Sequence, residues 1–511
     1  MTTDTHLDAI IDGIRGYAQR AGLDFFPTLF EVVDYCRMNE IASYGGFPNR
    51  YPHWRFGMEF ERLRKSYAYG LHRVSEMVIN NSPCYAYLLK CNNLVDQKLV
   101  IAHVYAHSDF FKNNLWFAHA NRRMIDEMAN HASHIHRHAE KHGFEAVEAF
   151  LNIALSIDDL IDPHSPFIQR RRTKPRTEFG PDPDPVTPRK LACKPYMDRF
   201  INTPEFMAAQ RRLLDQQHER EQHLPERPER DVLLFLTEHG RLERWQRDIL
   251  SIIREESYYF APQGQTKIMN EGWATYWHSR IMTGHVLTDT ELVDYADHHA
   301  ATLACRPGTI NPYKLGVELF RDIEDRWNKG RFGPDYDRCD DLAQRNAWDT
   351  HLGQGLQKIF EVRRIYNDVS FIDAFLTRDF CERHRLFAYA HDDRSGRYVI
   401  TDRDFENIKR KLLFALTNFG QPFIYAADGN HRNRGELLLA HRHDGIDLRW
   451  DYAKDVLANV QRIWDRPVSL QTVVEEHPRL LRFDGVDYRE TDGTEADTTT
   501  EPEPAVAAAT A

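Results

Sequence analysis

The sequence predicts an α+β protein: a mostly helical main domain containing a small strand pair, followed by a smaller C-terminal α+β domain. Apolar residues recur at helical spacing through most of the first 378 positions. After residue 379, short apolar runs alternate with turn sequences such as Asp428-Gly429-Asn430, a pattern typical of strands. With 511 residues, 42% of them hydrophobic, the chain is long enough to bury more than one core.

The domain layout follows from where apolar residues thin out. We expect residues 1–378 to form the helical domain, with mobile loops near 168–190 and 216–231, where charged residues and proline replace apolar ones. Residues 379–485 are expected to form the α+β domain. Residues 486–511 contain mainly Thr, Glu, Pro and Ala near their end and predict a disordered tail.

Within the helical domain, residues 7–40 read as helical, and an aromatic, glycine-containing loop follows at 44–57. Apolar runs at 74–80 and 84–89 predict the strand pair. Further helical patterns cover residues 94–107, 122–142, 145–161, 243–260, 402–417 and 452–464. The helix at 94–107 is expected to close at Ser108, and the helix at 243–260 is expected to break at Pro262.

Composition excludes several classes of function. The net charge of -11 argues against a nucleic-acid partner, because such binding depends on Lys and Arg neutralising phosphates. No apolar stretch approaches the length of a membrane span, and the N-terminus lacks the pattern of a secretory signal. Seven scattered cysteines without CxxC pairs indicate free thiols. We therefore expect a cytoplasmic protein.

Two distant stretches predict a metal site. His103 and His107 stand four residues apart, so on a helix both imidazoles share one face. Glu271, on a second predicted helix, is the expected carboxylate ligand, since two imidazoles and one carboxylate hold Zn²⁺ with a position open for water. His131, among apolar neighbours, is either a fourth ligand or a buried core histidine.

Candidate catalytic residues lie around Glu271. Glu255 or Glu256, one helix earlier, is a candidate general base, with a salt bridge to Arg254 as the alternative. Tyr276 and His278 follow Glu271 on the same helix. Helical rise places His278 about 10 Å from Glu271, so it is expected to act outside the ligand set or as an oxyanion donor.

The segment Asn270-Glu271-Gly272-Trp273-Ala274 resembles the glutamate-ligand segment of gluzincin aminopeptidases. That resemblance implies a gluzincin-like helix pair. Those enzymes carry His-Glu-x-x-His, in which the glutamate is the general base, whereas the corresponding residue here is Val104. Valine cannot accept a proton from water.

Longer motifs resemble the stage V sporulation protein R (SpoVR) family. They are Tyr44–Pro48, Arg50–Trp54, His103–Asn114 and Lys267–Ala274, and the similarity runs from about Gly22 to Val473. The resemblance implies a bacterial or archaeal protein with a role in spore cortex formation. In organisms that do not form spores it implies a stress-related role beside a PrkA-type serine kinase.

Two functions remain open at this point. The first is a zinc-dependent hydrolase, an amidase or peptidase acting on cell-wall material, with Arg50, His53 and Trp54 recognising a peptidoglycan-related substrate. The second is a non-catalytic binding or regulatory protein with a degenerate or structural metal site, partnered with the kinase. The ligand trio favours the first and Val104 favours the second.

Overall fold

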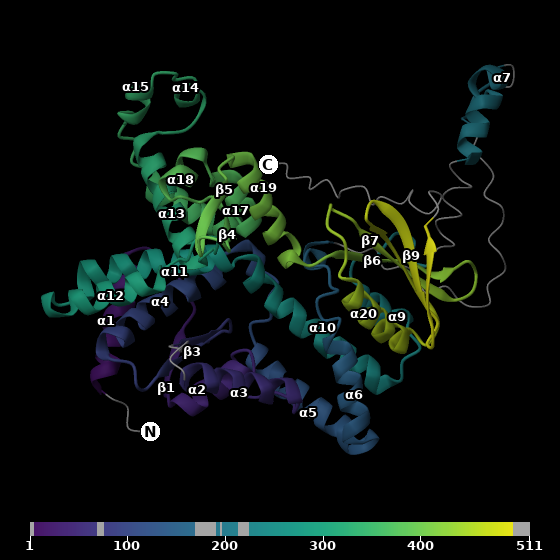
Figure 1. The fold of residues 1–511 in the computed structure, drawn as a ribbon, viewed down its shortest axis with the longest axis horizontal. Coiled ribbons are helices and arrows are strands. Elements are labelled where there is room, and N and C mark those ends of the chain that lie inside the picture. Colours follow the sequence, from purple (N-terminus) through teal and green to yellow (C-terminus); the bar gives the residue numbers. More distant parts are fainter. Residues whose placement is uncertain (1–4, 69–75, 169–190, 195–196, 213–223, 494–511) are drawn as a thin grey trace. The chain divides into compact units, whose positions relative to one another are not determined.

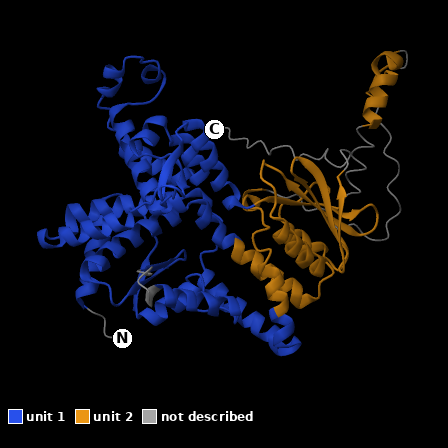
Figure 2. Cartoon of the chain, in the orientation of Figure 1, with its two compact units in different colours: residues 1–148, 258–421 blue, residues 149–257, 422–511 orange. Residues whose placement is uncertain are grey.

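The computed structural model describes residues 5–68, 76–168, 191–194, 197–212 and 224–493. Most of the loop predicted near 168–190 lies outside these residues, as do part of the loop near 216–231 and the tail from 494 onward. Contacts divide the chain into two compact units (Figure 2): residues 1–148 with 258–421, and residues 149–257 with 422–511. Residues 379–421, expected in the C-terminal domain, thus group with unit 1, and residues 149–257 group with unit 2.

Unit 1 begins with helices around a small sheet (Figure 1). Its first elements are α1 (Thr5–Arg20), β1 (Thr28–Val33), α2 (Tyr35–Ser43), α3 (Trp54–Ala68), β2 (Glu76–Ile79) and β3 (Cys84–Leu89). The strands order as β1-β3-β2, and β2 and β3 confirm the predicted strand pair. The helix predicted over 7–40 is wrong at residues 28–33, because this segment pairs in parallel with β3 along its whole length. Three of its six residues are β-branched, which suits a pleated strand.

The remainder of unit 1 is mainly helical. Its helices are α4 (Leu94–Asn113), α5 (Met124–His142), α11 (Lys267–Ile281), α12 (Leu292–Thr302), α13 (Pro312–Lys329), α14 (Pro334–Asp337), α15 (Leu342–Asn346), α16 (Gly355–Ile365), α17 (Asp368–Phe375), α18 (Arg378–Arg383) and α19 (Phe405–Leu416). Strands β4 (Ala388–Asp392) and β5 (Arg397–Asp402) form an antiparallel pair. Helix α6 (Phe144–Leu155) spans the change from unit 1 to unit 2.

Helix α4 lies in the core of unit 1. The side chain of Asn93 accepts a hydrogen bond from the backbone N–H of Asp96 and so caps its first turn. The predicted end at Ser108 is wrong: Ser108 and Asp109 are fully buried, and the helix continues to Asn113. Asp109 accepts a hydrogen bond from the indole N–H of Trp273, so this polar residue links two helices instead of forming a turn.

Unit 2 combines helices with a five-stranded sheet. Its helices are α7 (Asp198–Ile201), α9 (Val232–His239), α20 (Trp450–Trp464) and most of α10 (Arg244–Gln265). Its strands are β6 (Phe423–His431), β7 (Glu436–Arg442), β8 (Val468–Val474), β9 (His477–Phe483) and β10 (Tyr488–Asp492). The sheet order is β10-β9-β8-β7-β6, and within the described part of this sheet only the β7–β8 pair is parallel. Strand β10 therefore occupies the start of the segment predicted as a tail.

The predicted break at Pro262 is also wrong, because α10 continues through it to Gln265. A proline removes one N–H donor from a helix, and one lost bond does not end a helix held by its neighbours. The hydroxyl of Thr266 donates to the Pro262 carbonyl and satisfies that acceptor at the helix end. Across the part of the chain that the structure describes, no helix is long and apolar enough to cross a membrane.

Candidate metal site

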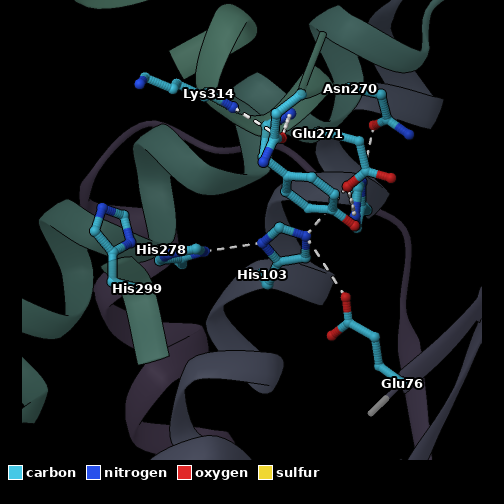
Figure 3. A network of polar contacts seen from close by, with 10 residues as sticks. Glu76, His103, Asn270, Glu271, His278, His299 and Lys314 are labelled. Carbon is cyan, nitrogen blue, oxygen red and sulfur yellow. Dashed lines mark hydrogen bonds and ion pairs between the residues drawn. The ribbon is translucent and has the colours of Figure 1, made fainter. Parts of the chain in front are cut away.

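Two histidines and two carboxylates from three elements of unit 1 lie close together, and Figure 3 shows His103 between Glu76 and Glu271. His103 and His107 lie one turn apart on α4, and Glu271 lies on α11, which packs against α4. Glu76 is the first residue of β2, which also contacts α4. Within the described ranges, Glu76, His103 and His107 form the group whose ligand atoms lie close enough together to hold one ion.

The distances suit a shared cation better than direct hydrogen bonds. His103 Nε2 lies 3.5 Å from Glu76 Oε1 and 3.6 Å from Glu271 Oε2, and His107 Nε2 lies 3.6 Å from the same Glu271 oxygen. Separations of this size are long for a hydrogen bond. Two atoms that each lie about 2.0–2.1 Å from a tetrahedral Zn²⁺ are roughly 3.3 Å apart. The spacing is therefore close to the one that coordination of a single ion imposes.

The carboxylates have unused acceptor atoms. Oε2 of Glu76 and Oε2 of Glu271 are buried and have no hydrogen-bond partner among the described atoms. A buried carboxylate oxygen without a partner is costly, and a cation removes that cost. The glutamate side chains are 22% and 19% exposed, whereas those of His103 and His107 are 4% and 8% exposed, so the glutamates lie nearer the surface of unit 1 than the histidines.

Hydrogen bonds orient both imidazoles. Nδ1 of His107 lies 2.9 Å from Oδ1 of Asn270, and since an amide oxygen only accepts, Nδ1 carries the proton. In the neutral ring, Nε2 then presents its lone pair to Glu271. Nδ1 of His103 lies 2.8 Å from Nδ1 of His278, whose Nε2 lies 3.3 Å from Nδ1 of His299. If Nδ1 of His103 donates to Nδ1 of His278, and Nε2 of His278 donates to Nδ1 of His299, then Nε2 of His103 carries no proton and its lone pair can bind a metal.

The pKa values respond to burial and to this crowding of charge. Burial raises the pKa of Glu76 to about 7, with the Glu271 charge adding to the shift. Burial opposes protonation of His103, but Glu76 and Glu271 outweigh it and raise the pKa of that imidazole. Burial and the neighbouring His103 lower the pKa of His107 to about 4. Burial also opposes ionisation of Glu271, yet both histidines together lower its pKa.

Polar contacts fix α11 in place. The carboxylate of Asp368, the first residue of α17, accepts hydrogen bonds from the backbone N–H groups of Ile268 (2.8 Å) and Met269 (2.9 Å). These N–H groups belong to the first turn of α11, where no intrahelical acceptor exists. Two residues beyond Glu271, Trp273 donates to Asp109 of α4 at 2.9 Å. Glu271 is thus held between two anchored points.

Helix α13 passes very close to α11 at a pair of glycines. A β-carbon on Gly272 would overlap the backbone of Gly316, and one on Gly316 would lie 2.7 Å from the Cα of Gly272. This crossing places Tyr313 of α13 beside Glu271, where its phenol helps to lower the pKa of the carboxyl. The ring of Tyr313 stacks beside that of His103, with centroids 6.1 Å apart.

Of the four predicted ligands, the structure brings His103, His107 and Glu271 close together. The group that could hold an ion in the described ranges consists of His103, His107 and Glu76, and it includes neither Glu271 nor His131, which is buried on α5. His278 contacts His103 directly, with the two Nδ1 atoms 2.8 Å apart, and its catalytic role stays a prediction. Tyr276 instead donates to Glu324 Oε2 at 2.7 Å and contacts Arg280.

The predicted general bases lie elsewhere in the chain. Glu255 and Glu256 belong to the part of α10 that groups with unit 2, and their role as a base stays a prediction. The neighbouring Arg254 pairs with Asp231 Oδ2 at 2.7 Å. Val104 is fully buried in the core of unit 1 and supplies no proton acceptor.

Sequence reasoning missed Glu76, Asn270 and His299 as members of this site. Asn270 directly precedes Glu271 in the motif that indicated the site, so a hydrogen bond from a histidine ligand to Asn270 could have been predicted. Glu76 gave no such signal, because a lone acid at the start of a short strand has no spacing that relates it to His103.

Comparisons with known proteins give consistent results over nearly the whole chain. A family model described as SpoVR like protein matches residues 2–421, and one described as SpoVR-like C-terminal domain matches residues 422–475. The chain is 29% identical over 507 residues to the "Uncharacterized protein YcgB" of Escherichia coli (strain K12), with 92% of each chain covered. No solved structure matches the chain.

Proposed function

The chain belongs to the SpoVR family, and from the geometry of its buried site we propose that it is a zinc-dependent hydrolase of amide bonds in cell-wall material. The observation that carries the proposal is the convergence of His103 Nε2 and His107 Nε2 on one oxygen of Glu271, 3.6 Å from each. Two imidazoles and one carboxylate are the ligand set of several zinc hydrolases.

A bound zinc ion would lower the pKa of a coordinated water and polarise the scissile carbonyl. The protein must also supply a proton acceptor, and Val104 does not. We assign this role to Glu76, whose Oε1 lies 3.5 Å from His103 Nε2 and whose other oxygen has no hydrogen-bond partner among the described residues. Glu76 takes a proton from the attacking water and returns it to the leaving nitrogen as the C–N bond breaks.

The choice of substrate rests on the family resemblance to spore cortex factors, and the site is compatible with it. A peptide or amide of peptidoglycan offers the carbonyl that a zinc ion polarises. The side chains of Glu76 and Glu271 are 22% and 19% exposed, more than those of the histidines, so a substrate would approach from the glutamate side.

Metal analysis of the purified full chain tests the proposal. We expect about one zinc per chain in the natural protein and loss of zinc in His103→Ala and in Glu271→Gln. His136→Ala is the control, since its imidazole is exposed on α5 and pairs only with Glu140 in the described structure. Release of new amino groups from peptidoglycan fragments should follow the zinc content. A natural chain that takes up no divalent metal overturns the proposal.

One observation favours a second function. Val104 stands where gluzincins carry their base, and four protein ligands including Glu76 would close a zinc site to water, as in structural sites. In that case the chain is a regulatory protein with a structural metal, acting with a PrkA-type serine kinase in the cytoplasm. Glu271→Gln distinguishes the two: a structural site loses zinc and thermal stability together, whereas a catalytic site loses hydrolysis with little change in melting temperature.

A further inference from the structure

A separate cavity of about 580 Å³ opens on unit 1, on helix α13 and the segments around it. Its walls come from the loop Cys305–Asn311, from α13, from the end of α18 with residues 384–389, and from α19. Among these described lining residues none is a histidine or glutamate of the candidate metal site. The volume lies in the range of small-molecule sites.

The floor of the cavity is apolar. Leu315, Phe380, Ile408 and Leu412 line it, and each is at most 7% exposed. They come from three helices that pack in the same hydrophobic core, so the floor is a rigid surface. Such a surface favours an apolar body of matching size.

The rim of the cavity is cationic. Arg306, Lys314, Arg385 and Lys411 line it, whereas Glu318 is the one acidic side chain among the described lining residues. Glu318 is already paired with Arg321 at 2.9 Å. Lys411 lies 3.9 Å from Asp402, a long and solvent-exposed pair, and no carboxylate of the described chain lies within ion-pair distance of the other three. Among the described residues, the rim therefore carries more positive than negative charge, and three of its four cations have no carboxylate within ion-pair distance.

We propose that this cavity binds an amphipathic anion: a small molecule with one carboxylate or phosphate group attached to an apolar chain or ring. The apolar floor accepts the body and the four cations hold the charged head. A cationic or neutral ligand of the same shape would lack the second contribution. This site is independent of the proposed hydrolase function. Helix α13 contributes to both sites: Tyr313 lies beside Glu271, and the next residue, Lys314, lines the cavity.

Calorimetric titration of the full chain with eight-carbon probes tests the proposal. We expect octanoate and octyl phosphate to bind with one site per chain, and octylammonium and octanol to bind at least tenfold more weakly. Comparison of octanoate with octyl phosphate identifies the preferred head group. Equal affinity for all four probes, or no binding by either anion, overturns the proposal.

Variants locate the binding. Arg385→Glu with Lys411→Glu should weaken octanoate binding at least tenfold, whereas Arg410→Glu, an exposed neighbour on α19 outside the lining, should change it less than twofold. Ala415→Trp fills the cavity without changing charge and should also abolish binding. Unchanged affinity in Ala415→Trp would overturn the assignment. His103→Ala should keep full octanoate affinity, and loss of binding there would place the carboxylate on the metal site instead.

Discussion

Gly272 of α11 and Gly316 of α13 touch backbone to backbone, with no room for a β-carbon on either residue. This contact sets the separation of the two helices at the position of Glu271. Tyr313, one turn before Gly316, reaches the candidate site only because the helices are this close. These two glycines offer no ligand atom, yet their contact determines how Glu271 and Tyr313 are placed.

Gly316→Ala tests this relationship. The added methyl would collide with the carbonyl of Ile268 and with Gly272, so α13 must move away. Overpacking of this kind costs about 1–3 kcal/mol, and we expect that loss in denaturant unfolding together with weaker zinc binding. Gly13→Ala is the matched control, because a β-carbon on Gly13 in α1 meets nothing within 4 Å. It should be neutral or stabilising by up to about 1 kcal/mol.

Glu76→Gln separates the two roles open to that residue. If Glu76 is the proton acceptor, the variant keeps its zinc and loses hydrolysis by about 100-fold or more. If Glu76 is a fourth ligand, zinc content falls as it does in Glu271→Gln. Zinc analysis and amide hydrolysis on the same preparation measure both quantities. Full hydrolysis with full zinc would contradict the proton-acceptor role.

Val104→Glu should not restore a gluzincin-type base. Val104 is fully buried, among apolar neighbours that include Ile101 and Tyr105, so an added carboxylate would be desolvated in the core. We expect a loss of several kcal/mol in the free energy of unfolding and no gain in hydrolysis. Val104→Gln has nearly the same size without the charge and should cost less, with the difference growing as pH rises. A stable, more active Val104→Glu variant would show that this position faces the metal.

His278→Ala tests the support given to His103. Without the hydrogen bond to His278, the ring of His103 loses its fixed tautomer and orientation. Such losses lower metal affinity by roughly 10- to 100-fold. Competition with a zinc chelator measures the change, and His136→Ala should leave affinity unaltered. His278→Gln, which retains a hydrogen-bonding group, should recover part of it.

Asp368 gives the stability of unit 1 a pH dependence. Burial raises the pKa of this carboxyl to about 7, from 3.8 in the unfolded chain. Between these values the folded state keeps a proton that the unfolded state releases, so ionisation of Asp368 lowers the free energy of unfolding as pH rises from about 4 to about 7. Asparagine does not ionise, so Asp368→Asn removes this pH dependence. The difference in free energy of unfolding between the natural protein and the variant, measured by denaturant unfolding, should therefore fall as pH rises from about 4 to about 7. Asp373→Asn, an exposed change on the same helix, should keep the natural profile.

Local patterns predicted the parts of the site that lie close together in sequence. The spacing of His103 and His107 and the motif around Glu271 were sufficient to predict that these three residues lie near one another on two helices, as the structure shows. The strand pair at β2 and β3 was likewise predicted, because each strand is a short apolar run bounded by polar residues. These features depend on residues a few positions apart.

Features that depend on distant partners were not predictable in this way. Residues 28–33 form a strand because β3 lies beside them, and Ser108 does not end α4 because Asp109 has a buried partner in Trp273. Glu76 joins the site through the pairing of β2 with β3, which no short motif encodes. At each of these positions, tertiary contacts determine the structure and override the preference of the local sequence.

Each compact unit is built from two segments that are separated in the sequence, so neither unit can fold completely until its second segment has been synthesised. The bridge between Glu229 and Ala426 joins the two halves of unit 2, so the first half leaves the ribosome nearly 200 residues before its partner strand exists. Helix α11 likewise emerges about 100 residues ahead of Asp368, which binds its first turn. Unit 1 can close only after translation has passed Asp368, and unit 2 only after it has passed Ala426. Any metal would therefore enter a site whose helix α11 gains its Asp368 contact about 100 residues after that helix is made.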